Sequence, residues 1–283
     1  MTTMKKLTIV FCVVCVISDI SVINGQDVLD GVYVPEHTPT RKVIPYTHLR
    51  EADVMWAKRI WRVIDLREKI NHPFYFPVTP IQNRKALIDV LKEGIMEGTI
   101  TAYADAVIDD EFKSPMAKEE VTALFTGSDT VYTDDLDNPG QLIQKIVEKN
   151  LEASAIKQYW IKEDWFFDKQ RSVMDVRIIG ISPLQEKMDE SGNFKGFEPM
   201  FWIYYPQARY VFANYEIFNR ENDSERRTYE DLFWKRMFNS YIRKESNVYD
   251  RTIMEYTKGL DQQLESERIK EEIFNFEHDL WHF

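Results

Sequence analysis

The apolar pattern changes period near residue 158, and this change limits the folds open to the chain. Apolar side chains alternate with mostly polar ones over 158–168 and again over 173–182. Such two-residue alternation predicts half-buried strands, and the polar tetrapeptide at 168–171 predicts a hairpin turn between them. The run Met200–Tyr205 is apolar throughout and predicts a central strand. We expect one antiparallel sheet from these three strands.

Helical periodicity dominates on both sides of this region. Apolar residues recur at helical spacing over 49–70 and 84–96, and Gly98 marks the end of the second segment. Further helices are predicted from Ser114-Pro115 to Gly127, after Asn138-Pro139, over 227–244 and over 260–276. The acidic stretch 127–140 lacks the ligand order of a calcium-binding loop and is interpreted as a solvated loop. The expected fold is α+β, with helices flanking a small antiparallel β-meander in a single main domain over 47–283.

The N-terminus has the pattern of a secretory signal peptide. Lys5 and Lys6 precede the apolar run Leu7–Ile17, and the small residue Gly25 follows. This run is shorter than the roughly 20 residues that a membrane-spanning helix needs. We therefore interpret residues 1–25 as a signal peptide removed on export. Residues 26–46, interrupted by prolines, are expected to form an extended arm.

Both cysteines, Cys12 and Cys15, lie inside the apolar run of this peptide. Neither follows a small residue, as a lipid-attachment cysteine would. Export would leave a chain without a disulfide, a reactive thiol or a lipid anchor. We therefore expect a protein with no direct membrane span and no lipid attachment.

Charge and motif content narrow the classes of function. A formal net charge of −11 disfavours sequence-independent binding to nucleic acid. The sequence contains no zinc-protease helix motif, no serine nucleophile elbow and no glycine-rich phosphate loop. His278 and His282 are spaced like metal ligands but have no convincing third partner. We accordingly assign no catalytic, cofactor-binding or metal-binding residue and expect a protein that is not an enzyme.

One catalytic alternative stays open. Glu163, Asp164 and Asp168 lie close together in the predicted hairpin, and paired carboxylates are the machinery of glycosidases. A periplasmic hydrolase of this type is therefore the second hypothesis. Surface charge or ion pairing with Lys162 and Arg171 is the simpler role for these carboxylates.

Several long sequence blocks resemble the gliding-motility GldN/PorN family. These blocks are INHPFYFP (70–77), IKEDWFFDKQRSVM (161–174), RRTYEDLFWKRMF (226–238), KESNVYDR (244–251) and EEIFNFEHDLWHF (271–283). The resemblance implies a periplasmic component of the type IX secretion machinery, associated peripherally with the outer membrane. It also implies three kinds of partner, namely a GldK/PorK-like lipoprotein, a GldM/PorM-like motor protein and further copies of the chain in a ring. It supplies no catalytic residue.

A ring subunit needs aromatic contact surfaces, because aromatic side chains are enriched at interface cores. Trp61 lies off the apolar stripe of its predicted helix, and Trp160 and Phe166 stand on the otherwise polar face of their strand. These three residues are the partner-binding candidates. Packing within the subunit is the equally weighted alternative for each.

Overall fold

The computed structural model describes residues 41–81, 84–104, 111–134, 142–188, 193–219, 222 and 224–280. Residues 37–283 form one compact unit, to which all described residues belong. The predicted signal peptide and residues 26–40 of the predicted arm lie outside the described residues. Residues 41–50 have no regular secondary structure.

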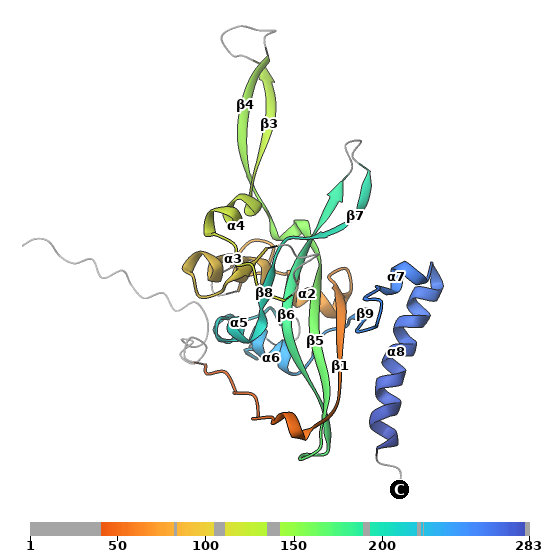
Figure 1. Cartoon of the computed structure of the whole chain (residues 1–283). Helices are drawn as coiled ribbons and strands as arrows, with labels where there is room; N and C mark the ends of the chain where they lie inside the picture. Colours follow the sequence, from red (N-terminus) through yellow and green to blue (C-terminus); the bar gives the residue numbers. More distant parts are fainter. Residues whose placement is uncertain are drawn as a thin grey trace, which may run out of the picture. The chain divides into compact units, whose positions relative to one another are not determined.

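A seven-stranded sheet runs through this unit (Figure 1). Its order is β2-β8-β6-β5-β1-β9, with β7 also paired to β6, and every pairing is antiparallel. The strands are β1 Val54–Asp65, β2 Ala102–Tyr103, β5 Ile156–Asp168, β6 Val173–Met188, β7 Phe194–Pro199, β8 Trp202–Tyr204 and β9 Tyr241–Glu245. The predicted α+β class is confirmed, although the sheet is wider than the expected three-stranded meander.

The β5–β6 hairpin confirms the strands predicted from two-residue alternation. The two strands pair from Ile156↔Gln185 to Asp168↔Val173. The Asp168 carboxylate closes the turn, because it accepts hydrogen bonds from the Gln170 backbone N–H at 2.9 Å and from the Arg171 guanidinium at 2.6 Å. Strand β8 lies between β2 and β6, which confirms a central strand here, although it covers only Trp202–Tyr204 of the predicted run Met200–Tyr205. Helix α5, Tyr205–Phe212, begins directly after it.

The predicted helix over 49–70 is wrong, because this segment contains strand β1. Trp56, Ile60 and Ile64 recur every four residues, a spacing that places them on one face of a helix and equally on one face of a strand. Every residue over 62–65 is buried, so the alternation typical of a half-buried strand is missing there. Pairing of β1 with the distant strand β5, which the local pattern does not contain, determines the conformation.

A separate two-stranded sheet replaces a predicted loop and a predicted helix. Strand β3, Thr126–Asp134, pairs antiparallel with β4, Leu142–Asn150. The solvated-loop prediction is therefore wrong for 127–134, while residues 135–141 lie outside the described residues. The helix predicted after Asn138-Pro139 is also wrong, because residues 142–150 form strand β4, which pairs with β3.

Four helices and the main hydrophobic core adjoin the central sheet. The helices are α2 His72–Tyr75, α3 Leu87–Glu97, α4 Lys118–Phe125 and α5 Tyr205–Phe212. Helix α3 ends as predicted at Gly98, whose φ of 80° permits its N–H to reach the carbonyls of Gly94 and Ile95. Helix α4 ends before Gly127, as predicted, but the predicted start at Ser114-Pro115 is wrong, because the helix begins at Lys118 and its N-cap residue is Ala117. Short 3-10 turns occupy Glu51–Asp53, Lys69–Asn71 and Ala153–Ala155.

The predicted helix over 227–244 is only partly correct. Helix α6 covers Tyr229–Trp234, and the chain then enters strand β9. Thr228 caps α6, since its side chain accepts a hydrogen bond from the Asp231 backbone N–H. Arg236 adopts a left-handed backbone conformation, with φ of 51°, at the point where the helix stops. Such a conformation is uncommon for arginine and has no local sequence signal.

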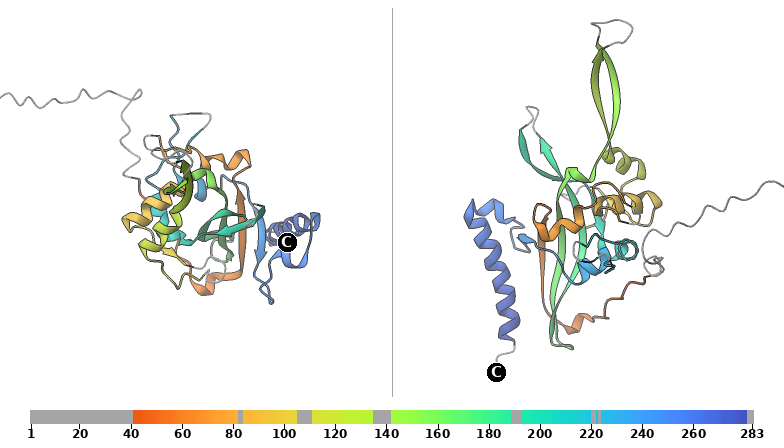
Figure 2. Two further views of the ribbon diagram at one scale, coloured as in Figure 1. Left: turned by 90° about the horizontal axis from the view of Figure 1, so that it is seen from above. Right: turned by 180° about the vertical axis from the view of Figure 1, so that it is seen from behind.

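The last helix, α8 Leu260–Asp279, confirms the prediction for the C-terminal region. It lies alongside β9, whereas α3, α4 and α5 lie at the other side of the sheet (Figure 2). Ile269 and Ile273 of α8 form a second core with Ile60, Ile242 and Ile253. Helix α7, Ile253–Tyr256, supplies the last of these residues.

Candidate interaction surfaces

The structure brings two of the three predicted partner-binding residues together. Trp61 packs against the buried cluster that contains Trp160, whereas Phe166 lies elsewhere. Trp160 is 9% exposed and Phe166 is 4% exposed, so both contribute to packing within the subunit. Trp61 is half-buried, and the ammonium groups of Lys244 and Lys162 lie 4.5 and 5.8 Å from its ring. A partner role for these residues stays a prediction.

The carboxylates left open for a hydrolytic pair are each bound by an arginine. Glu163 accepts hydrogen bonds of 2.8 and 3.1 Å from Arg236 and a further one from the Trp165 indole N–H. Asp164 pairs with Arg59 at 2.6 Å. Asp168 pairs with Arg171, as the sequence indicated. These carboxylates therefore join strands and turns of the subunit.

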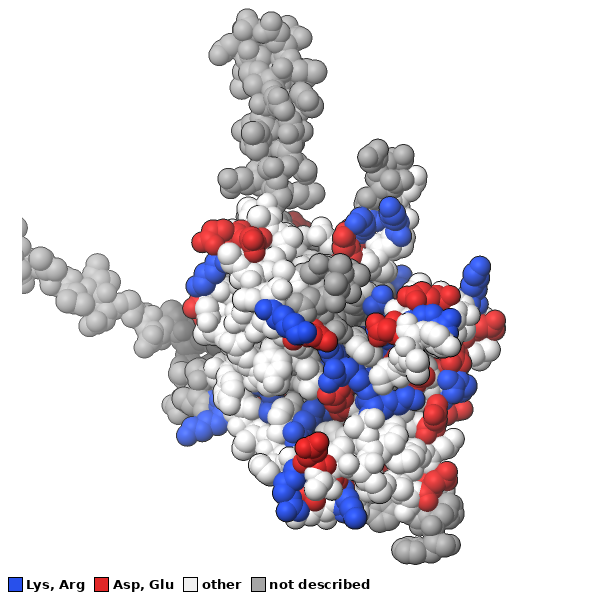
Figure 3. Space-filling view, viewed as in Figure 1, with Lys and Arg blue, Asp and Glu red and all other residues white. Residues whose placement is uncertain are grey.

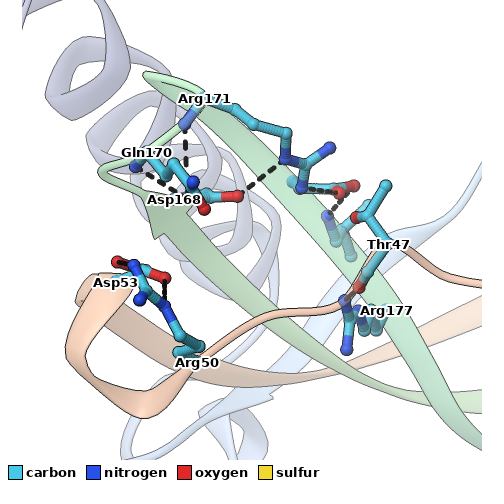
Figure 4. A network of polar contacts seen from close by, with 9 residues as sticks. Thr47, Arg50, Asp53, Asp168, Gln170, Arg171 and Arg177 are labelled. Atoms are coloured by element: carbon cyan, nitrogen blue, oxygen red, sulfur yellow. Dashed lines mark hydrogen bonds and ion pairs between the residues drawn. The ribbon is translucent and has the colours of Figure 1, made fainter.

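A polar network surrounds the turn of the β5–β6 hairpin (Figure 4). Arg171 bridges Asp168 and Asp175, and its hydrogen bond holds the pKa of Asp168 below the usual range. The backbone N–H of Lys169 donates to the Asp53 carbonyl oxygen at 2.8 Å. Arg177 donates to the Thr47 carbonyl oxygen at 2.7 Å, so the network also binds the segment before β1.

That segment, residues 41–50, binds to helices α5 and α6 through a buried ion pair. Arg209 is 3% exposed and contacts Glu230 at 2.6 Å, while its guanidinium also donates to the Ile44 carbonyl oxygen at 2.7 Å. The Tyr46 ring lies 4.1 Å from the Arg209 guanidinium and stacks on Trp234. Burial raises the pKa of the Tyr46 hydroxyl to about 12.

A cavity of about 460 Å³ lies between α8 and the sheet. Arg62 of β1 and Trp165 of β5 line one side, and α8 supplies the other. Its α8 lining consists of Glu267, Lys270, Glu271, Ile273, Phe274 and Glu277. Burial lowers the pKa of the Arg62 guanidinium, which donates to the Ser240 hydroxyl and carbonyl oxygens. The cavity lining therefore combines aromatic and aliphatic side chains with several carboxylates.

Charged side chains gather over α7 and α8 on the face in Figure 3. Part of this charge is neutralised locally, since Arg268 pairs with Glu265 and Glu272. Within the ranges described above, no group of three or more His, Cys, Asp and Glu side chains is arranged to hold a metal ion. Of the two histidines considered as ligands, His278 is exposed and His282 lies outside the described residues.

Sequence reasoning missed Arg62, Arg209 and the cavity beside α8. The arginines occur within apolar segments, and a basic residue surrounded by apolar ones is a signal for a buried or partner-facing cation. The sequence contains no comparable signal that would predict the cavity. It depends on how α8 packs across strands β1 and β5, which are distant from α8 in the sequence.

These features define an α+β protein whose described surfaces combine ion pairs, aromatic contacts and a cavity. The family model described as gliding motility associated protein GldN matches residues 49–282. The chain therefore belongs to the GldN family and is a component of the gliding-motility and type IX secretion machinery. The family resemblance of the sequence blocks is thereby confirmed.

Two further findings accompany the family assignment. A search among curated proteins found no match to the chain. Among the described residues, no helix combines the length and the apolar character that a membrane span requires.

Proposed function

We propose that the protein is a non-catalytic structural subunit of the periplasmic ring of this machinery. In this role it binds a GldK/PorK-like outer-membrane lipoprotein, contacts a GldM/PorM-like periplasmic motor protein and assembles with further copies of itself. The observation that carries the proposal is the family match over 49–282, which spans nearly all of the described residues.

The chemistry of the described residues supports a binding role. Glu163, Asp164 and Asp168 are each bound by an arginine within the subunit, so no pair among them is free to act on a substrate. Large apolar side chains are exposed instead, including Val248, Tyr249 and Phe274. Exposed aromatic groups of this kind are typical anchors of protein–protein contacts.

The N-terminal pattern supports a peripheral location. The signal peptide expected at 1–25 would deliver the protein to the periplasm, and its removal would take away both cysteines. Attachment to the outer membrane would then depend on the lipoprotein partner. The proposed localisation is therefore periplasmic and peripheral to the outer membrane.

Affinity purification tests this proposal. A tagged form of the full chain, purified from detergent-extracted outer membranes, is expected to bring down an outer-membrane lipoprotein in stoichiometric amount. Mass spectrometry identifies the partner. Recovery of the tagged protein alone, from cells in which secretion works, would contradict the proposed role.

A further inference from the structure

The loop between β9 and α7, residues 247–251, is held in a fixed conformation by one side chain. The Asn247 amide group donates hydrogen bonds to the carbonyl oxygens of Glu245 and Arg251, at 3.0 and 2.8 Å. Its oxygen accepts from the backbone N–H groups of Tyr249 and Arg251. Asp250 in turn pairs with Lys244 at 2.6 Å. The 247–251 loop is thus preorganised, which reduces the entropy lost on binding.

This loop exposes apolar and cationic groups together. Val248 is 97% exposed and Tyr249 is 75% exposed. The Arg251 guanidinium lies 4.5 Å from the Tyr249 ring, and Arg251 forms no ion pair with any described residue. A rigid loop that presents tyrosine and arginine has the composition of an interface hot spot.

The cavity beside α8 has the complementary properties. Its walls contain Trp165, Ile273 and Phe274, and Phe274 is 66% exposed. Its volume of about 460 Å³ falls within the roughly 300–1,000 Å³ of ligand-binding clefts. Glu271 and Glu277 also line it and form no ion pair with described residues. The cavity therefore suits an aromatic side chain flanked by a cation.

We propose that the 247–251 loop of one copy binds the cavity beside α8 of a second copy. Tyr249 enters between Trp165 and Phe274, and Arg251 pairs with the carboxylates of Glu271 and Glu277. No residue of the loop lines the cavity of its own copy, so each copy offers both surfaces. A net charge of −11 opposes non-specific self-association, whereas this contact joins opposite charges. The inference rests on the proposed assembly of several copies.

Disulfide trapping tests this contact in cells that contain the working machinery. Two differently tagged full chains are co-produced, with Cys12 and Cys15 changed to serine in both. One carries Val248→Cys and the other Lys270→Cys, at an exposed residue that lines the cavity, and both changes leave Tyr249 and Phe274 in place. We expect a disulfide-linked pair of the two tagged chains. The control pairs Val248→Cys with Tyr210→Cys, an exposed position on α5, and should give no such product.

Charge exchange tests the specificity of the trapped pair. Arg251→Glu in the chain with Val248→Cys is expected to lower the cross-linked yield about tenfold, the ratio that corresponds to 1.4 kcal/mol. Glu271→Arg with Glu277→Arg in the other chain should restore the yield. Lys258→Glu makes the same charge change on an exposed residue outside the loop and should have no effect.

The outcomes separate this inference from the proposed function. If the lipoprotein co-purifies but Val248→Cys does not link to Lys270→Cys, the contact is wrong and the ring role stands. An equal yield with the Tyr210→Cys control, or an equal loss with Lys258→Glu, would also overturn the contact. Absence of the lipoprotein would instead count against the proposed function.

Discussion

Arg236 binds Glu163 through two hydrogen bonds, of 2.8 and 3.1 Å, and thereby joins the end of helix α6 to strand β5. Glu163 is completely buried. Arg236 has a left-handed backbone conformation with φ of 51°. The ion pair therefore stabilises the point where the chain leaves α6 and turns toward strand β9.

Removal of this arginine should destabilise the subunit strongly. Arg236→Ala leaves the Glu163 carboxylate buried without its cation, a change that costs about 3–5 kcal/mol. Urea unfolding at neutral pH measures the loss. As a control, Arg50→Ala breaks an ion pair with Asp53 in which the arginine is largely exposed, and should cost much less because exposed ion pairs contribute little to stability. Similar losses in the two variants would contradict this role of Glu163.

How well the sequence predicts the structure differs from one segment of the chain to the next. The β5–β6 hairpin is predictable because alternation and turn residues lie within the segment itself. Strand β1 is not, since it is buried on both faces in its second half and depends on pairing with β5. The early end of α6 is also not predictable from the local sequence, because Arg236 forms its ion pair with Glu163, which is distant in the sequence.

The candidate interaction surfaces are likewise not predictable where they depend on residues that are distant in the sequence. The sequence identifies Trp61 because it lies off the apolar stripe of its predicted helix. In the structure it is half-buried, and the Lys244 ammonium group lies over its ring. Trp160 and Phe166 were expected on a polar face, but both sides of most of β5 are covered. The cavity beside α8 depends on long-range packing, which residue patterns along one segment do not describe.

Alanine variants distinguish packing from partner binding at the three aromatic residues. Trp160→Ala and Phe166→Ala remove buried rings and should cost about 3–5 kcal/mol of unfolding free energy. Trp61→Ala, at a half-buried site, should cost less and instead reduce association with the lipoprotein. Thermal unfolding of the isolated subunit and co-purification from cells measure the two effects. If Trp160→Ala lost association with the lipoprotein while its stability stayed unchanged, Trp160 would be a partner-binding residue, which would contradict this assignment.

The Tyr46 ring should control how firmly residues 41–50 are bound. Tyr46→Ala removes the contacts with Arg209 and Trp234, so trypsin should cleave after Arg50 several-fold faster. Tyr46→Phe keeps the ring and should behave like the original protein. Mass spectrometry of timed digests gives the rates, with cleavage after Lys258 as an internal reference. Equal rates after Arg50 in both variants would show that the ring is dispensable.

Stability should fall in acid because several carboxylates have lowered pKa values. Hydrogen bonds from Arg171, Lys85 and Arg268 lower the pKa of Asp168, Glu93 and Glu265 respectively. In the unfolded chain such groups titrate at about pH 4. Their contribution is therefore fully present above that pH and is lost as the pH falls through the lower folded-state values.

Urea unfolding at pH 6 and pH 3 measures this loss. Asp168→Asn removes one of the titrating groups, so the decrease in unfolding free energy between the two pH values should be smaller in this variant. An identical decrease in both proteins would mean that Asp168 does not contribute to the acid sensitivity.

The most direct test of the central claim is the location of the protein in cells that lack the partner lipoprotein. The account predicts that the protein fractionates with the outer membrane when the lipoprotein is present. When the lipoprotein is deleted, the protein should appear in the soluble periplasmic fraction or be degraded. Immunoblots of separated fractions give the answer. Retention in the outer membrane without the lipoprotein would contradict a peripheral subunit held there by its partner.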